Sequence, residues 1–278
     1  ITASTFAQCE LAGNAHLRWR VEDSRCASRY TGAMNSRSIF LRGCMLLALA
    51  GVSAWSAGCR DVVTSTAGSR EGTSAAAAAR GPGYLTPDER PDSVALLPPP
   101  PAPGSPEFAA DEAVYRELGA LQGTARWQLA ARDANLKFPE AANVFSCAVG
   151  IDVTEATTPR LYALLQRTVI DAGQSTAKAK QRYQRERPFE VTGDPTCVPE
   201  DEKVLRGNAS YPSGHASLGY VWGEVMAELL PDRAVAARAR AYEFGQSRVV
   251  CRVHRQSDVD AGRIVGQAGF RFLHQGVR

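Results

Sequence analysis

Residues 210–231 decide the fold class, and their sequence is SYPSGHASLGYVWGEVMAELLP. Within 215–230, large apolar side chains recur at the spacing of one face of an α-helix. These apolar residues are Leu218, Val221, Trp222, Val225, Met226 and Leu229. Pro231 ends the pattern because proline cannot donate a helical hydrogen bond. The stretch therefore predicts an amphipathic helix, preceded at Ser213 and Gly214 by residues typical of a helix start.

Helical patterns continue on both sides of this stretch. Residues 107–132 consist mostly of Ala, Leu, Glu, Arg and Gln, which favour helix, and shorter apolar stripes with helical spacing follow. The further helices predicted in this way span 107–132, 158–171, 176–187, 232–250, with Asp232 as the cap, and 256–274. No alternating strand pattern bounded by turns occurs in the body of the sequence. We therefore expect an all-α fold, a single-domain helical bundle over residues 83–278.

The composition excludes several classes of function. The 278 residues are 44% hydrophobic, enough to bury a sizeable core. The formal net charge of +3, from 32 basic and 29 acidic residues, is too balanced for a dedicated nucleic-acid-binding protein, so we expect no nucleic-acid partner. The seven cysteines contain no CxxC pair, which excludes a zinc ribbon or a thioredoxin-type site.

Residues 34–58 have the pattern of an export signal peptide. Two arginines precede an apolar run over 45–54, and small residues follow it. The apolar run is about half of the roughly 20 residues that span a bilayer. Residues 56–59, SAGC, resemble a bacterial lipobox, so Cys59 is a candidate for lipidation and for a lipid anchor to a bacterial membrane. A freely soluble exported form is the alternative, and both forms are expected in the periplasm.

The segments on either side of the signal are expected to lie outside the folded domain. Residues 1–33 precede the first methionine, Met34, and are interpreted as a non-native or disordered upstream extension. Residues 59–82 contain mostly Ser, Thr, Ala and Gly, which is typical of a flexible linker. The prolines of 96–103, LLPPPPAP, cannot form helix and predict an extended arm packed on the domain, with an SH3-type ligand as the alternative.

Three cysteines lie in the predicted domain, at Cys147, Cys197 and Cys251. If Cys59 is lipidated, they leave an odd thiol in an oxidising compartment. The sequence leaves open which pair, if any, forms a disulfide.

The first of three motifs joins Lys180 to Arg187 and Pro188. Positions seven apart lie on the same face of a helix, so both cations are expected to project the same way from the helix over 176–187, which Pro188 ends. Two convergent cations suit an anion. A solvated basic face is the alternative, because other basic residues lie nearby in the sequence.

The second motif is PSGH at residues 212–215, at the start of the predicted helix. Unpaired amides and the helix dipole make such a start a cradle for an anion, and Gly214 lets a ligand approach the backbone. Ser213 adds a hydroxyl donor, and His215 can carry a transferable proton. A turn with Ser213 as an ordinary N-cap residue is the alternative.

The third motif contains Ser247, Arg248, His254 and Asp258. His254 and Asp258 can meet on one face of a helix, where the carboxylate holds one ring nitrogen protonated and directs the other as a nucleophile or base. A surface His/Asp pair on a helix has the same spacing and is the alternative. His274 has no such neighbours and is interpreted as a terminal surface residue.

In order and spacing these residues resemble the signature KxxxxxxRP, PSGH and SRxxxxxHxxxD of the acid phosphatase and vanadium haloperoxidase superfamily. The residues of 96–101, 210–215 and 256–260 look like those of the bacterial class A nonspecific acid phosphatases. The resemblance runs from about residue 83 to residue 269. It implies a helical bundle of the acid phosphatase/haloperoxidase type, with neither a metal nor a cofactor, and we expect a homo-oligomer.

The resemblance also implies a role for each residue. His254 corresponds to the nucleophile that attacks phosphorus, Asp258 to the residue that orients it, and His215 to the general acid for the leaving group. The residues implied to bind the phosphate are Lys180, Arg187, Ser213, Gly214 and Arg248. The implied reaction is hydrolysis of small phosphomonoesters (nucleotides, sugar phosphates, aryl phosphates) through a phosphohistidine, and an acceptor alcohol in place of water gives phosphotransfer.

The sequence departs from that family at three places. Ala216 stands where threonine is usual, and Arg255 stands where an aromatic residue often follows the nucleophile. The chain ends at Arg278, earlier than family members, so we expect a truncated C-terminus. A vanadate-dependent haloperoxidase and an inactive, truncated phosphate-binding lipoprotein are the alternative functions. An integral-membrane lipid phosphatase is not favoured, because the body has no apolar run of about 20 residues.

Overall fold

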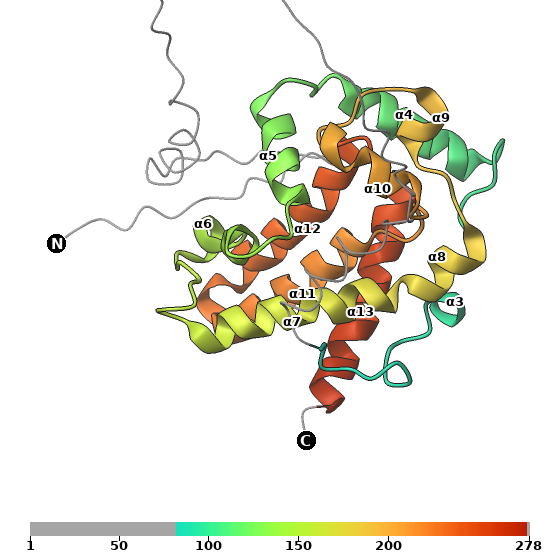
Figure 1. Ribbon diagram of the computed structural model, residues 1–278. Helices are drawn as coiled ribbons and strands as arrows, with labels where there is room; N and C mark the ends of the chain where they lie inside the picture. Colours follow the sequence, from blue (N-terminus) through green and yellow to red (C-terminus); the bar gives the residue numbers. More distant parts are fainter. Residues whose placement is uncertain (1–81, 277–278) are drawn as a thin grey trace, which may run out of the picture. The chain divides into compact units, whose positions relative to one another are not determined.

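Every regular element among residues 82–276, the part of the chain that the computed structural model describes, is a helix (Figure 1). This confirms the predicted all-α class. The predicted signal, the lipidation site, the upstream extension and the linker up to residue 81 lie outside the described residues. The α-helices are α3 (Ser93–Leu96), α4 (Pro106–Gly119), α5 (Ala125–Ala134), α6 (Ser146–Val149), α7 (Pro159–Ser175), α8 (Ala177–Tyr183), α9 (Pro188–Thr192), α10 (Glu202–Arg206), α11 (Gly214–Leu229), α12 (Ala234–Val250) and α13 (Gln256–Gly276). The 3-10 helices are η1 (Glu140–Asn143), η2 (Pro199–Asp201) and η3 (Pro231–Arg233).

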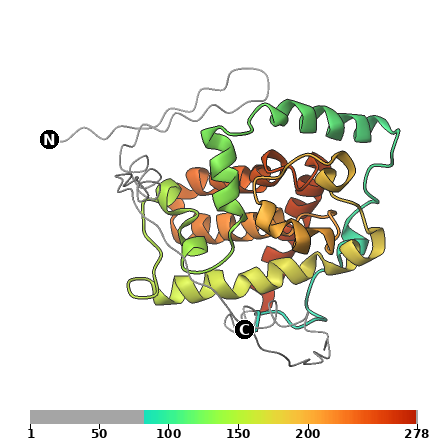
Figure 2. The same cartoon turned by 45° about the horizontal axis from the view of Figure 1, so that its top comes forward.

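The helix predicted from residues 210–231 is α11, and it packs against α7, α12 and α13 (Figures 1 and 2). Its Trp222 is fully buried, and the indole Nε1 donates to the Leu165 carbonyl at 3.2 Å and to Thr168 Oγ1 at 3.0 Å. Because the polar edge of the ring is satisfied in this way, the large apolar surface of Trp222 can anchor α11 to α7 without an unpaired donor.

Glycines let α12 and α13 approach α11 closely. A Cβ at Gly223 would lie 2.4 Å from the Cβ of Ala241 in α12. A Cβ at Gly262 in α13 would lie 2.4 Å from the carbonyl oxygen of Ser213. No larger residue fits these contacts without moving a helix. The close approach lets the backbone N–H of Ser213 donate to the Asp258 carbonyl at 2.8 Å, which joins the start of α11 to the first turn of α13.

Two further contacts hold segments against the bundle. Leu97 is buried, and the Tyr211 hydroxyl donates to the Pro98 carbonyl at 2.9 Å, so the proline-rich arm packs on the domain as predicted. Cys197 and Cys251 form a disulfide, a pairing that the sequence left open. The disulfide joins the segment before η2 to the loop between α12 and α13.

Two predicted helices are broken or shortened. Residues 107–132 contribute to two helices, α4 and α5, separated by a turn in which Gly123 has a φ of 77°. The helix expected over 176–187 ends before Gln184, which adopts the left-handed conformation with a φ of 45°. Pro188 begins α9 and does not end the preceding helix, because its fixed φ and missing N–H suit the first helical position.

Asp232 does not cap the helix that follows α11. It lies inside η3, which begins at Pro231, and the N-cap residue of α12 is Arg233, with no side-chain cap bond. The 3-10 turn that the proline starts delays the α-helix, so the predicted cap lies ahead of its first turn.

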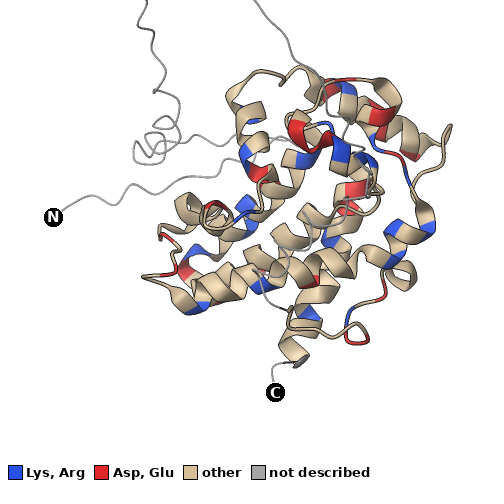
Figure 3. Cartoon of the chain, viewed as in Figure 1, with Lys and Arg blue, Asp and Glu red and all other residues tan. Residues whose placement is uncertain are grey.

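The positions of acidic and basic residues are interspersed along the described helices in the cartoon of Figure 3. Within residues 82–276, none of the helices combines the length and the apolar character needed to cross a membrane.

Candidate active site

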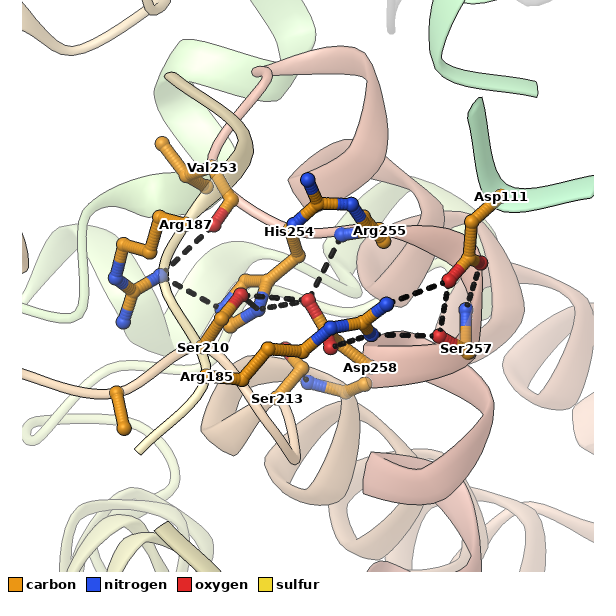
Figure 4. Close-up of polar contacts among 12 residues, drawn as sticks. Asp111, Arg185, Arg187, Ser210, Ser213, Val253, His254, Arg255, Ser257 and Asp258 are labelled. Carbon is orange, nitrogen blue, oxygen red and sulfur yellow. Dashed lines mark hydrogen bonds and ion pairs between the residues drawn. The ribbon is translucent and has the colours of Figure 1, made fainter. Parts of the chain in front are cut away.

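The residues of the three motifs come together from separate segments of the chain. In chain order they are Lys180 of α8, Arg187 of the loop before α9, Ser213 at the N-cap of α11, Gly214 and His215 of its first turn, Arg248 of α12, His254 of the loop before α13 and Asp258 of its first turn. The charges of Lys180 and Arg187 both act on His254. Figure 4 shows Arg187 on one side of the His254 ring and Asp258 on the other.

Arg187 determines which ring nitrogen of His254 carries the proton. Arg187 Nη1 lies 3.1 Å from His254 Nε2. Because an arginine nitrogen can only donate, Nε2 accepts this bond and holds a lone pair. Nδ1 then carries the proton of the neutral ring, and it lies 3.4 Å from Asp258 Oδ2 and 3.3 Å from Ser210 Oγ. Burial, followed by the charge of Arg187, lowers the pKa of His254 well below its usual range and keeps the ring neutral.

Asp258 is fully buried, and both of its carboxylate oxygens accept hydrogen bonds. Oδ2 accepts from Ser210 Oγ at 2.6 Å and from the backbone N–H of Arg255 at 2.8 Å, and Oδ1 accepts from Arg185 Nη1 at 2.6 Å. Burial alone would raise the pKa of the Asp258 carboxyl, but the bonds and charges of His254, Arg185 and Ser210 outweigh burial and hold it well below its usual range. The carboxylate is therefore ionised when it faces His254.

Lys180, Arg187 and Arg248 form a group of like charges, in which the two arginines are buried and Lys180 is half-buried. Burial, followed by the charge of Arg187, lowers the pKa of Lys180 to about 7 and that of Arg248 to about 9. Burial also lowers the pKa of Arg187 to about 10. Nε and Nη1 of Arg248 are buried and find no hydrogen-bond partner among the described residues. Buried charged donors without partners are costly, so this group is of the kind that a bound anion completes.

The first turn of α11 leaves room for a ligand. Ser213 is buried, and its Oγ accepts the backbone N–H of Ala216 at 3.3 Å, which is the ordinary capping bond. A Cβ at Gly214 would meet no atom of the described residues closer than Thr176 Oγ1 at 4.0 Å, so packing does not require glycine there. The N–H groups of a first helical turn lack partners within the helix and are available to an anion.

His215 lines a cavity of about 600 Å³. Its Nε2 donates to the Ala134 carbonyl at 3.1 Å, and its ring stacks on that of Phe244 with the centroids 5.9 Å apart. Burial, followed by the charge of Arg248, lowers the pKa of His215 well below its usual range. Aliphatic side chains line the cavity together with charged residues of both signs, which are Arg132, Lys137, Glu200 and Asp201.

Two of the predicted geometries are wrong in detail. Lys180 and Arg187 do not share a helix face, because α8 ends before Gln184 and Arg187 lies in an extended segment. His254 and Asp258 do not pair across one helix face either, because α13 begins only after His254, and the contact forms through the turn that enters the helix. His274 is exposed, as expected, and its Nε2 lies 2.8 Å from the Glu228 carboxylate.

Two of the three sequence departures, Arg255 and Ala216, lie beside the site. Arg255 directs its side chain toward α4, where Nε donates to Glu112 Oε1 at 3.0 Å. Ala216 is buried, and a Cβ at Gly262 of α13 would lie 2.9 Å from the Cβ of Ala216. The close packing of α13 thus favours a small residue at position 216.

Sequence reasoning missed Ser210, Arg185 and Asp111, all of which bond within the site. Arg185 is one of the basic residues near Lys180 in the sequence, which the alternative of a solvated basic face would leave exposed. The sequence does contain a signal for Arg185. Arg187 precedes Pro188 and therefore favours an extended conformation, and alternate residues of an extended segment, here Arg185 and Arg187, point to the same side. Arg185 and Arg187 do both reach the His254–Asp258 pair.

The fold and the site define a class of protein that the comparisons identify. Residues 161–278 match the PAP2 superfamily. The chain is 44% identical over 192 residues to a non-specific acid phosphatase of Providencia stuartii, with 69% of this chain and 77% of the relative covered. It is 42% identical over 191 residues to a non-specific acid phosphatase of Salmonella typhimurium (68% and 76% covered) and 37% identical over 183 residues to an acid phosphatase of Zymomonas mobilis (66% and 69%). The chain belongs to the class A non-specific acid phosphatases of the PAP2 superfamily.

Proposed function

We propose that the protein hydrolyses phosphate monoesters by transferring the phosphoryl group to Nε2 of His254. The observation that carries this proposal is the lone pair on Nε2 beside the group of cations formed by Lys180, Arg187 and Arg248. The cations suit the oxygens of a phosphoryl group, and a neutral imidazole is a good nucleophile. The acid phosphatases among its relatives support the reaction class.

In the first step, Arg187 turns its donors from Nε2 to the phosphoryl oxygens, and the Nε2 lone pair attacks phosphorus. The P–N bond forms while the bond from phosphorus to the ester oxygen breaks. The cations, the Ser213 hydroxyl and the Gly214 amide neutralise the phosphoryl oxygens in the transition state. The Asp258 carboxylate stabilises the positive ring of the phosphohistidine through Nδ1.

His215 supplies the proton that the leaving oxygen needs. Its low pKa keeps the ring neutral in the free protein, and a phosphate dianion beside it favours the protonated form. Because the Ala134 carbonyl holds the proton on Nε2, the transferable proton is the one on Nδ1. Water then gives a proton to Nδ1 of His215 and attacks phosphorus, and the P–N bond breaks, which frees inorganic phosphate and His254. An acceptor alcohol in place of water gives phosphotransfer.

The cavity beside His215 supports a broad range of leaving groups. Its aliphatic walls and its charges of both signs match no single leaving group. Nucleotides, sugar phosphates and aryl phosphates are therefore the proposed substrates, selected by their phosphoryl group. The chemistry needs no metal or cofactor, since protein cations supply the charge stabilisation that a Lewis acid would supply.

The sequence supports further proposals on location. The pattern of residues 34–58 supports export to the periplasm, and Cys59 in its lipobox-like context supports a lipid anchor. We also propose that the protein is a homo-oligomer.

Hydrolysis of p-nitrophenyl phosphate across pH, with a chelator present, tests the proposed function. The parent and the surface control His274→Ala are expected to be active, and His254→Ala inactive. When the reaction of the parent with a phosphoryl-labelled substrate is quenched, we expect label bound covalently to the protein. This label should be lost in acid and retained in base, because a phosphohistidine has that stability. Activity that disappeared with the chelator, or that survived in His254→Ala, would refute the mechanism. Halide oxidation with vanadate would favour the haloperoxidase alternative.

A further inference from the structure

A chain of buried charges leads from Asp258 to α4. Arg185 Nη1 donates to Asp258 Oδ1 at 2.6 Å, and Arg185 Nη2 donates to Asp111 Oδ2 at 2.9 Å (Figure 4). The side chains of Arg185 and Asp111 are 8% and 3% exposed, and that of Asp258 is not exposed at all. One planar guanidinium thus bridges two buried carboxylates, a geometry that a lysine cannot reproduce.

Asp111 is itself held in place by the start of α13. Its Oδ1 accepts the backbone N–H of Ser257 at 2.8 Å, and its Oδ2 accepts the Ser257 hydroxyl at 2.5 Å. The N–H of Ser257 belongs to the first turn of α13, where amides have no partner within the helix, so Asp111 caps α13 from α4. The same carboxylate therefore anchors Arg185 and the helix that carries Asp258.

We infer that Arg185, held by Asp111, is a positioning residue that fixes the Asp258 carboxylate and, through it, the orientation of the His254 ring. The hydrogen bonds of the Arg185 side chain go to Asp111, Ser257 and Asp258, so it acts on the reaction through Asp258. The inference rests on the proposed function, in which His254 is the nucleophile.

The physical reason is that the two carboxylate oxygens of Asp258 contact different residues. Oδ1 bonds Arg185, while Oδ2 faces His254 Nδ1. Without the guanidinium, Oδ1 loses its charged partner and the carboxylate is held only through Oδ2, by Ser210 and the Arg255 amide, so more of its negative charge acts on the ring. The pKa of His254 then rises, and Nε2 becomes protonated at a higher pH.

Other charged or titratable groups lie around Arg185 and the His254–Asp258 pair, and the substitution of Arg185 does not alter their identity. They are Lys180 of α8, Arg187 before α9, Tyr211 before α11, His215 of α11, Arg248 of α12 and Asp111 of α4.

The test is the pH profile of kcat/KM for p-nitrophenyl phosphate in Arg185→Gln, Arg185→Lys and Asp111→Asn. In Arg185→Gln, we expect kcat to fall about 10-fold to 100-fold, KM to change less than about threefold because the phosphate clamp is intact, and the acid limb to move up by about half a pH unit to one unit. Arg185→Lys keeps the charge but cannot bridge both carboxylates, so its acid limb stays near the parent's while kcat falls. Asp111→Asn also lowers kcat without raising the acid limb.

Arg263→Gln is the matched control, because Arg263 forms a 2.6 Å ion pair with Asp260 on the same helix. Its kcat and acid limb are expected to match those of the parent. An acid limb in Arg185→Gln that coincides with the parent's overturns the inference, whatever happens to stability. An unchanged kcat in Asp111→Asn also overturns the inference, and this second result can be measured even if Arg185→Gln does not fold.

Nitrogen NMR of the His254 ring in the ligand-free protein separates this inference from the proposed function. A proton on Nδ1 in the parent, and a titration midpoint that rises in Arg185→Gln, support the inference without any measurement of activity. A proton on Nε2 in the parent, or a midpoint that does not rise, overturns it. A parent with this ring tautomer but without phosphatase activity contradicts the proposed function instead.

Discussion

Replacement of Arg248 by methionine is expected to stabilise the phosphate-free protein while it disables the site. Two buried nitrogens of Arg248 have no partner among the described residues, and each such donor costs about 1–3 kcal/mol. Repulsion by Arg187 adds to this cost. A methionine fills much of the same volume without these donors, so we expect Arg248→Met to be about 2 kcal/mol more stable, which corresponds to about 4–8 °C in Tm for a domain of this size.

The assay is thermal unfolding with and without inorganic phosphate, alongside p-nitrophenyl phosphate kinetics. Phosphate at about 100 times its Kd is expected to stabilise the parent by about 2.7 kcal/mol and the Arg248→Met variant much less. The variant's kcat/KM is expected to fall about 100-fold to 1000-fold, the usual loss for one donor to the transition state.

The matched control lies on the same helix. Arg240 pairs with the buried Asp133, so Arg240→Met leaves this carboxylate without its ion-pair partner and is expected to cost about 3–5 kcal/mol of unfolding free energy. The two arginine-to-methionine changes should therefore move Tm in opposite directions. If Arg248→Met proved less stable than the parent in phosphate-free buffer, the reasoning about its unpaired donors would be wrong.

Three other predictions follow from the packing and the charges. Gly262→Ala is expected to lower the free energy of unfolding by about 1–3 kcal/mol and to lower kcat, because its Cβ would lie 2.4 Å from the backbone oxygen of Ser213. The control Gly173→Ala, whose Cβ would have no atom within 4 Å, is expected to be as stable as the parent or more stable in a thermal melt. Replacing both Cys197 and Cys251 by serine is expected to lower the free energy of unfolding by about 2–4 kcal/mol, as measured by denaturant unfolding. A denaturation midpoint equal to that of the parent would contradict this. Because the pKa of Lys180 is about 7, its charge is present below pH 7 and lost above it, so the Ki of phosphate should rise above pH 7 in the parent and rise less in Lys180→Met.

The helices were predictable where local pattern and tertiary packing agree. Residues 215–230 carry a regular apolar stripe, and α11 covers Gly214–Leu229. The prediction failed at Gln184, whose left-handed conformation ends α8 within a run of good helix formers. Helix propensity sums weak preferences of about 1 kcal/mol or less per residue, and tertiary contacts outweigh such sums. The bonds of Arg185 to Asp111 and Asp258 are contacts of this kind.

The sequence by itself determined the family of this protein. Two histidines, an aspartate, three cations and a glycine-containing helix start occur in an order and spacing that identify it. Tertiary structure alone decided how they work together. It placed the proton of His254 on Nδ1 through Arg187, left two nitrogens of Arg248 without partners, and joined Asp258 to Asp111 through Arg185. These contacts join residues up to 147 positions apart, since Asp111 and Asp258 meet across Arg185, and no local pattern encodes such distances.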